Sequence, residues 1–155
     1  MKTIPLVLML SLLPINFAVS HEIGDTISKK AQQILNIPAG KVGVVDFFAS
    51  WCASCAKEIP DMKKFIKADT EQKTYVIGID VDEELEEGLA FQQELAIDFP
   101  VINDTDQSLI AEFSPIGMPA LYYVIDNKIV GKRIGAVDNI DEKIKADLAK
   151  LKVII

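Results

Sequence analysis

The stretch VVDFFASWCASCAKEIP, residues 44–60, holds the only two cysteines of the chain, Cys52 and Cys55, three positions apart. An apolar run precedes this pair, and a segment with helical periodicity follows it. Cys52 therefore lies where a buried strand is expected to meet the first turn of a helix. The N–H groups of a first turn have no partners within the helix, and they favour negative charge. The position favours a reactive thiolate at Cys52.

Two other uses of the cysteine pair have to be weighed against a reactive dithiol. A structural bridge between Cys52 and Cys55 would close a very short loop, and the stabilisation that a disulfide gives increases with loop length. A zinc site needs about four ligands, and beyond the two thiols the chain offers only His21 as a nitrogen ligand. We therefore predict thiol–disulfide exchange, with no metal site and no cofactor.

The first twenty residues, MKTIPLVLMLSLLPINFAVS, have the pattern of a secretory signal. An apolar run at 4–13 follows an early lysine, and small residues precede a cleavage site after Ser20. The alternative is a retained membrane anchor, although this apolar run is shorter than the ~20 residues that a spanning helix needs. We expect residues 1–20 to be removed and residues 21–155 to form a periplasmic domain, with a membrane-anchored form as the alternative.

Length and charge limit the remaining possibilities. The chain has 155 residues and a net charge of −7, and residues 21–155 suit one domain with a proper core rather than two. An acidic chain without a cluster of Lys and Arg argues against nucleic acid and anionic membrane surfaces as partners. We expect a monomer.

Hydrophobic periodicity alternates between strand and helix types along the chain. The predicted helices are 29–35, 52–68 with a bend at Pro60, 83–96, 106–113 and 140–151, and the predicted strands are 42–48, 74–79, 100–102, 120–126 and 128–134. This order predicts an α/β domain with a central mixed β-sheet flanked by helices. In the helix at 83–96, Leu85, Leu89 and Leu95 are the residues expected to be buried.

The segments VDFFASWCASC, at 45–55, and GMPALYYVIDNKIV, at 117–130, resemble the thioredoxin superfamily. Within it they resemble the exported TlpA/ResA-like thiol–disulfide oxidoreductases, over about residues 40 to 150. The resemblance implies a thioredoxin fold with a TlpA/ResA-like central insertion at 83–102. It also implies that Cys52 is the nucleophile, that Cys55 is the resolving thiol, and that the Met118–Pro119 bond is cis and lies beside the dithiol.

The same resemblance assigns substrate-binding roles around the cysteines. It places Trp51 on the docking surface and Met118 in the substrate groove, next to Pro119. Between the cysteines stand Ala53 and Ser54, where the family usually has a proline before the second cysteine, and these two residues would also contact substrate.

Asp46 matches a buried acid of cytoplasmic thioredoxins, but the lysine that accompanies that acid has no counterpart in this chain. Strand alternation places Asp46 in the buried strand, beneath the dithiol and near Cys55. Burial without a cation favours the neutral form of a carboxyl group and raises its pKa. We therefore expect Asp46 to act as a general base for Cys55.

These features together predict a periplasmic thiol–disulfide oxidoreductase. By resemblance, it would be a reductase of exported protein disulfides, for example in cytochrome c maturation, and would receive electrons from a membrane thiol transporter. Two alternatives remain open. The protein could be a disulfide oxidase or isomerase, or a non-catalytic binding or chaperone module with the same fold.

Overall fold

The computed structural model describes residues 21–152. In this part of the chain a five-stranded sheet has the order β3-β2-β1-β4-β5. The strands are β1 (Val42–Phe48), β2 (Thr74–Asp80), β3 (Val101–Asn103), β4 (Ala120–Ile125) and β5 (Lys128–Ile134). β1, β2 and β3 are parallel, whereas β4 is antiparallel to both β1 and β5. The predicted mixed sheet is confirmed.

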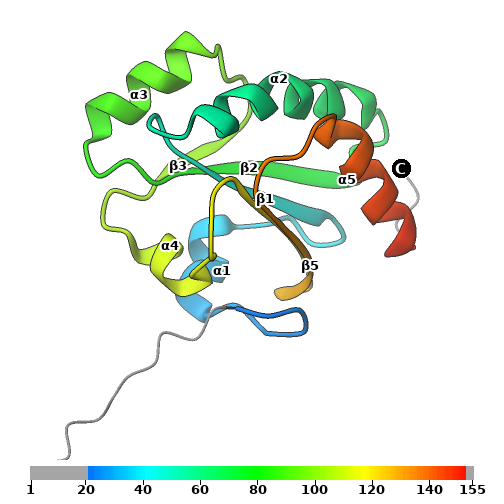
Figure 1. The fold of residues 1–155 in the computed structure, drawn as a ribbon. Coiled ribbons are helices and arrows are strands. Elements are labelled where there is room, and N and C mark those ends of the chain that lie inside the picture. The colour runs from blue at the N-terminus through cyan, green and yellow to red at the C-terminus, as the bar shows by residue number, and fades with distance from the viewer. Residues whose placement is uncertain (1–20, 153–155) are drawn as a thin grey trace, which may run out of the picture.

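Helices cover both faces of the sheet. They are α1 (Lys29–Leu35), α2 (Ala53–Ala68), α3 (Leu85–Glu94), α4 (Ser108–Phe113) and α5 (Ile140–Lys150). Figure 1 shows α2, α3 and α5 on one face and α1 and α4 on the other. α2 runs as one helix through Pro60, and the bend at this residue stays a prediction.

The central strand β1 contributes to both halves of the core, and every one of its residues is buried. The ring of Phe47 packs on Phe113 of α4, with centroids 5.1 Å apart. The ring of Phe48 packs on Phe91 of α3, with centroids 5.9 Å apart. Because side chains alternate between the faces of a strand, Asp46 shares the face of Phe48, which is the face covered by α2.

β4 and β5 form a hairpin after Pro119, and its turn residues explain how the two strands join. Asp126 and Asn127 have φ values of 48° and 65°. A two-residue turn of type I′ needs positive φ at both positions, and Asp and Asn tolerate this conformation. The turn therefore joins β4 directly to β5.

The prediction for the buried face of α3 is wrong at two leucines. Leu85 and Leu89 are each 47% exposed, and α3 buries Gly88 and Phe91 instead. A Cβ atom on Gly88 would lie 2.6 Å from Oδ2 of Asp80, so the helix backbone approaches β2 closely at this point. Leu95 is partly buried against the core, as expected. The close approach of Gly88 to Asp80 places Leu85 and Leu89 on the solvent side of α3. Hydrophobic periodicity does not detect such a contact.

The predicted insertion is present as α3 followed by β3, which pairs with β2 at the edge of the sheet. The predicted signal segment, residues 1–20, lies outside the described residues. Among residues 21–152, none of the helices has the length and apolar character needed to span a bilayer.

Candidate functional site

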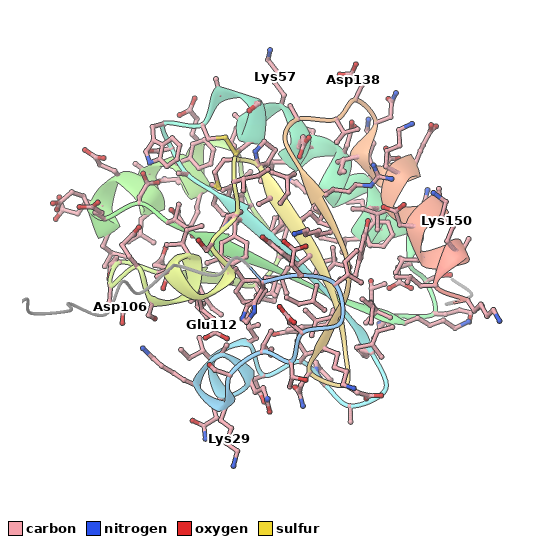
Figure 2. The ribbon with its side chains drawn as sticks, turned by 60° about the horizontal axis from the view of Figure 1, so that its bottom comes forward. Lys29, Lys57, Asp106, Glu112, Asp138 and Lys150 are labelled. Atoms are coloured by element: carbon pink, nitrogen blue, oxygen red, sulfur yellow. A yellow bond between two sulfur atoms is a disulfide. The ribbon has the colours of Figure 1, made fainter. Side chains whose placement is uncertain are left out.

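The two cysteines form a disulfide, with an S–S distance of 2.04 Å. Figure 2 draws this bond in yellow. Cys52 is the N-cap residue of α2, and its Sγ accepts the N–H of Cys55 at 3.3 Å. The sulfur of Cys52 thus lies at the positive end of the helix, where a thiolate is stabilised. The predicted junction of strand, cysteine and helix is present.

Both cysteines are buried in this oxidised form. Cys52 is only 6% exposed and Cys55 only 1% exposed. The bond joins the two sulfurs at the junction of β1 and α2, and both cysteines belong to the buried core there. Cys52 is nevertheless the more accessible of the two, and the order of nucleophile and resolving thiol stays a prediction.

Exposed apolar side chains occur on the two segments that carry the site. Trp51 is 66% exposed, and Ile116, two residues before Met118, is 91% exposed. The Met118–Pro119 peptide bond is cis, as the resemblance implies. The residue after Pro119 pairs with Phe47 near the carboxyl end of β1, so Pro119 reaches the sheet at the end from which Cys52 follows.

The residues between the cysteines differ in their surroundings. Ala53 is exposed and Ser54 is half-buried. The Oγ of Ser54 lies 3.6 Å from the Sγ of Cys52. Met118 is half-buried and packs against the core.

Asp46 is the buried acid of the site. It is 3% exposed, and its Oδ1 atom has no hydrogen-bond partner within the described part of the chain. Burial raises the pKa of Asp46 well above its ordinary value, and the negative charge of Glu58 raises this pKa further. Of the ion pairs seen among residues 21–152, none includes Asp46. The direction of the predicted shift in pKa agrees with the structure.

Glu58 is a site residue that the sequence analysis missed. It lies on α2, is 8% exposed, and its Oε1 accepts the N–H of Val137 at 2.6 Å. Burial raises the pKa of Glu58, the bond from Val137 opposes this rise, and the charge of Asp61 adds to it. Residues three apart on a helix share a face, so the position of Glu58 three residues after Cys55 was a usable signal.

A polar pocket lies between α2 and the segment that precedes α5. It is lined by residues of α2 and of the segment between β5 and α5, which are Ser54, Lys57, Glu58, Asp61, Ala136, Val137, Asp138 and Asn139. Figure 2 labels Lys57 and Asp138, which come from these two segments and point outward from the same side of the molecule. Ser54, which stands between the cysteines in the chain, is part of this lining, whereas Cys52 and Cys55 are not.

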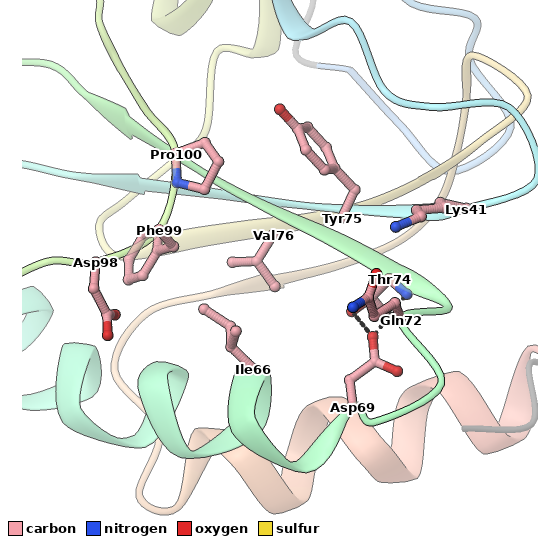
Figure 3. Close-up of a pocket in the computed structure, with 10 residues that line it drawn as sticks. All are labelled: Lys41, Ile66, Asp69, Gln72, Thr74, Tyr75, Val76, Asp98, Phe99 and Pro100. Atoms are coloured by element: carbon pink, nitrogen blue, oxygen red, sulfur yellow. Dashed lines mark hydrogen bonds between the residues drawn. The ribbon is translucent and has the colours of Figure 1, made fainter.

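A second groove lies toward the other end of α2, and Figure 3 shows its lining. Ile66, Val76 and Phe99 supply apolar walls, and Asp69 lies at the end of α2. The lining of this groove includes no cysteine. Within residues 21–152, the structure has no group of three His, Cys, Asp or Glu side chains that would suit a metal ion.

Comparison with known proteins gives matches of three kinds. The sequence model of the AhpC/TSA family matches residues 14–133. The thiol-disulfide oxidoreductase ResA of Bacillus cereus is 28% identical over 137 residues, which cover 88% of this chain and 75% of that protein. The thiol:disulfide interchange protein CycY of Rhizobium leguminosarum is 29% identical over 135 residues, covering 81% and 70%.

Among solved structures, the thiol:disulfide interchange protein DsbE of Chlorobium tepidum superposes with a TM-score of 0.71 at 19% identity. The match covers 84% of this chain and 98% of that one. StoA of Bacillus subtilis superposes with a TM-score of 0.63 at 21% identity, covering 70% and 83%. At these identities the likeness concerns the fold alone, and it confirms the predicted thioredoxin fold.

Proposed function

The chain belongs to the AhpC/TSA family of thioredoxin-like proteins, and we propose that it is a thiol–disulfide oxidoreductase that reduces the disulfides of exported proteins. The observation that carries this proposal is the Cys52–Cys55 disulfide at the start of α2, with the sulfur of Cys52 accepting a first-turn N–H. Relatives named for thiol–disulfide exchange support it.

The reaction begins with the reduced dithiol. The Cys52 thiolate attacks one sulfur of a substrate disulfide, which forms a mixed disulfide and releases the other substrate sulfur as a thiolate. Cys55 then loses its proton and attacks the sulfur of Cys52, which releases the second substrate thiolate. Two electrons pass to the substrate, and the protein is left with the Cys52–Cys55 bond that the structure contains.

The second step needs a proton acceptor, because a buried thiol surrounded by apolar groups keeps its proton. Cys55 is 1% exposed, so water reaches it poorly. Asp46 lies on the face of the sheet that α2 covers, and burial raises its pKa toward the range in which general bases work near neutral pH. We therefore assign Asp46 as the general base that takes the proton of Cys55. The negative charge of Glu58 raises the pKa of this base further.

The substrate contacts follow from exposure around the dithiol. Trp51 offers the largest exposed apolar surface next to Cys52. Ala53 and Ser54 lie between the cysteines, and Met118 lies next to Pro119. A substrate chain that crosses these residues brings its disulfide to Cys52.

The setting in the cell is part of the proposal. The N-terminal pattern supports export to the periplasm, with the mature chain beginning at His21 and a membrane-anchored form as the alternative. Exported disulfide proteins, for example in cytochrome c maturation, would be the substrates, a membrane thiol transporter would be the electron donor, and the protein would act as a monomer. N-terminal sequencing of the protein from its native source tests the first point, because a chain that still begins at Met1 would favour the anchor.

The direction of electron flow decides between a reductase and the oxidase or isomerase alternative. Equilibrating the Cys52–Cys55 couple with glutathione measures its reduction potential. A potential near the roughly −270 mV of thioredoxin supports the reductase, whereas one near the roughly −120 mV of DsbA requires an oxidase. A dithiol that fails to exchange with glutathione or insulin disulfides would instead indicate a non-catalytic binding module.

A further inference from the structure

A buried carboxylate outside the dithiol holds the segment that leads to it. Asp82 lies between β2 and α3 and is 4% exposed. Its Oδ2 accepts the N–H of Ser50 at 2.8 Å, and its Oδ1 accepts the hydroxyl of Ser50, also at 2.8 Å. Only Trp51 separates Ser50 from Cys52. Both carboxyl oxygens of Asp82 are therefore hydrogen-bonded to Ser50, two positions before Cys52.

The position of Asp82 depends in turn on hydrogen bonds that lead to α3 of the insertion. Its N–H donates to Oδ1 of Asp80 at 3.0 Å, and Gln92 of α3 donates to Oδ2 of Asp80 at 2.7 Å. Gly88 lets α3 lie against Asp80, since a Cβ at this position would be 2.6 Å from that Oδ2. A continuous set of hydrogen bonds thus connects α3 to Ser50.

The segment that Asp82 holds is a tight turn. The N–H of Cys52 donates to the carbonyl oxygen of Ala49 at 3.1 Å, so Ser50 and Trp51 are the two central residues of the turn. The turn sets where the chain enters α2, and with it the 3.3 Å distance from the Sγ of Cys52 to the N–H of Cys55. Both carboxyl oxygens of Asp82 are bonded to Ser50, so two hydrogen bonds from one side chain restrain the turn.

We propose that Asp82 is a positioning residue for the dithiol, which fixes the Ser50–Trp51 turn so that the sulfur of Cys52 stays at the N-terminus of α2. The inference rests on the proposed function for its catalytic meaning. This role would connect the insertion to the reaction, because hydrogen bonds through Asp80 and Asp82 link α3 to the turn that precedes Cys52.

The direction in which the pKa of the Cys52 thiol changes distinguishes this positioning role from a direct effect of the charge of Asp82. The helix terminus acts only over about one turn, so a loosened turn moves the Cys52 sulfur out of its reach and raises the pKa of the Cys52 thiol. The negative charge of Asp82 also raises that pKa, and removing the charge alone would lower it. Asp80 is the carboxyl group that contacts Asp82 most directly, and its pKa is raised by burial and also by the side chain of Asp82. Asp80, Asp46 and Glu58 keep their side chains in every variant.

Three variants of the full chain make the test. Asp82→Ala removes both hydrogen bonds to Ser50. Asp82→Asn removes the charge but keeps both bonds, because its amide oxygen accepts the N–H and its NH₂ group donates to the hydroxyl. The matched control is Asp69→Ala at the other end of α2, where Oδ2 of Asp69 accepts the N–H and the hydroxyl of Thr74 at 2.8 and 2.6 Å (Figure 3).

The measurement is the rate at which iodoacetamide alkylates Cys52 in the reduced proteins, followed against pH, with the modified cysteine identified by mass spectrometry. The pH at which the alkylation rate reaches half of its maximum is the midpoint, and it reports the pKa of the Cys52 thiol. We expect Asp82→Ala to raise this midpoint by about one pH unit, which slows alkylation about tenfold at pH values below the midpoint. Asp82→Asn should leave the midpoint unchanged or lower it. Asp69→Ala should lower the melting temperature and leave the midpoint in place.

The emission of Trp51, the one tryptophan of the chain, gives a second readout and should shift in Asp82→Ala but not in Asp69→Ala. A folded Asp82→Ala protein with an unchanged or lowered midpoint would overturn the proposal. If this variant does not fold, Ser50→Ala is measured instead, which removes the hydroxyl bond to Oδ1 of Asp82 and keeps the N–H bond to Oδ2. A smaller rise of the midpoint is expected there, and a lowered midpoint overturns the proposal. Alkylation requires no protein substrate, so a raised midpoint in a protein that fails to exchange disulfides would refute the proposed function and leave the positioning role standing.

Discussion

Replacing Asp46 with Asn removes an ionisable group from the core while keeping its shape. Asp46 is 3% exposed, its Oδ1 atom has no partner in the described part of the chain, and burial raises its pKa. The folded protein therefore opposes ionisation of this carboxyl group, whereas the unfolded chain does not. The stability of the wild-type protein must depend on pH in a way that Asp46→Asn does not share.

The size of the effect follows from proton linkage. Between the unfolded pKa of 3.8 and the raised folded pKa, the folded protein keeps a proton that the unfolded chain has lost. The free energy of unfolding then falls as the pH rises, by about 1.4 kcal/mol per pH unit for one group. Above the folded pKa both states are ionised and the fall stops. Relative to wild type, Asp46→Asn should gain stability with this slope.

Urea unfolding of the oxidised proteins at several values from pH 4 to pH 8 measures the difference. Asp98→Asn is the matched control, because it removes a carboxylate at an exposed position. The control should stay parallel to wild type over most of this range. A constant difference between Asp46→Asn and wild type from pH 4 to pH 8 would show that Asp46 does not carry a raised pKa, and the argument for a buried base would fail.

Three further predictions concern the reaction and the insertion. Asp46→Asn should leave the first attack by Cys52 unchanged and slow resolution of a preformed mixed disulfide by about 10²-fold, the usual size of general-base catalysis; identical resolving rates in stopped-flow experiments from pH 5 to pH 9 would remove its catalytic role. Cys55→Ser should accumulate mixed disulfides with partner proteins on non-reducing gels and Cys52→Ser should accumulate few, and equal trapping would reverse or abolish the assignment. Gly88→Ala should lower the free energy of unfolding by about 1 kcal/mol, since overpacking costs about 1–3 kcal/mol and alanine regains about 1 kcal/mol in a helix. Leu89→Ala, at an exposed position on the same helix, should change it by less, and the opposite ranking in urea would contradict the close packing of α3.

Local sequence could predict the dithiol and the framework that carries it. The apolar run before Trp51 becomes β1, and Cys52 becomes the N-cap of α2, because both depend on short-range patterning and on the chemistry of a helix start. The Asp126–Asn127 turn was predictable for the same reason, since these residue types tolerate positive φ.

Long-range polar contacts could not be predicted in this way. The bond from Asp82 to Ser50 joins residues 32 positions apart in the chain, and no periodic pattern marks it. Leu85 and Leu89 were assigned to the core because they are apolar, but the contact of Gly88 with Asp80 turns that face of α3 to solvent.

The most direct test of the central claim is the reaction of the reduced full-length chain with oxidised glutathione, followed by quenched-flow alkylation and mass spectrometry, with Cys52→Ser measured beside it. The account predicts that each wild-type chain consumes one disulfide through a mixed disulfide on Cys52 and ends with the Cys52–Cys55 bond, and that Cys52→Ser forms almost no adduct. Exchange at an equal rate in Cys52→Ser, or no exchange by the folded wild-type protein, would contradict it.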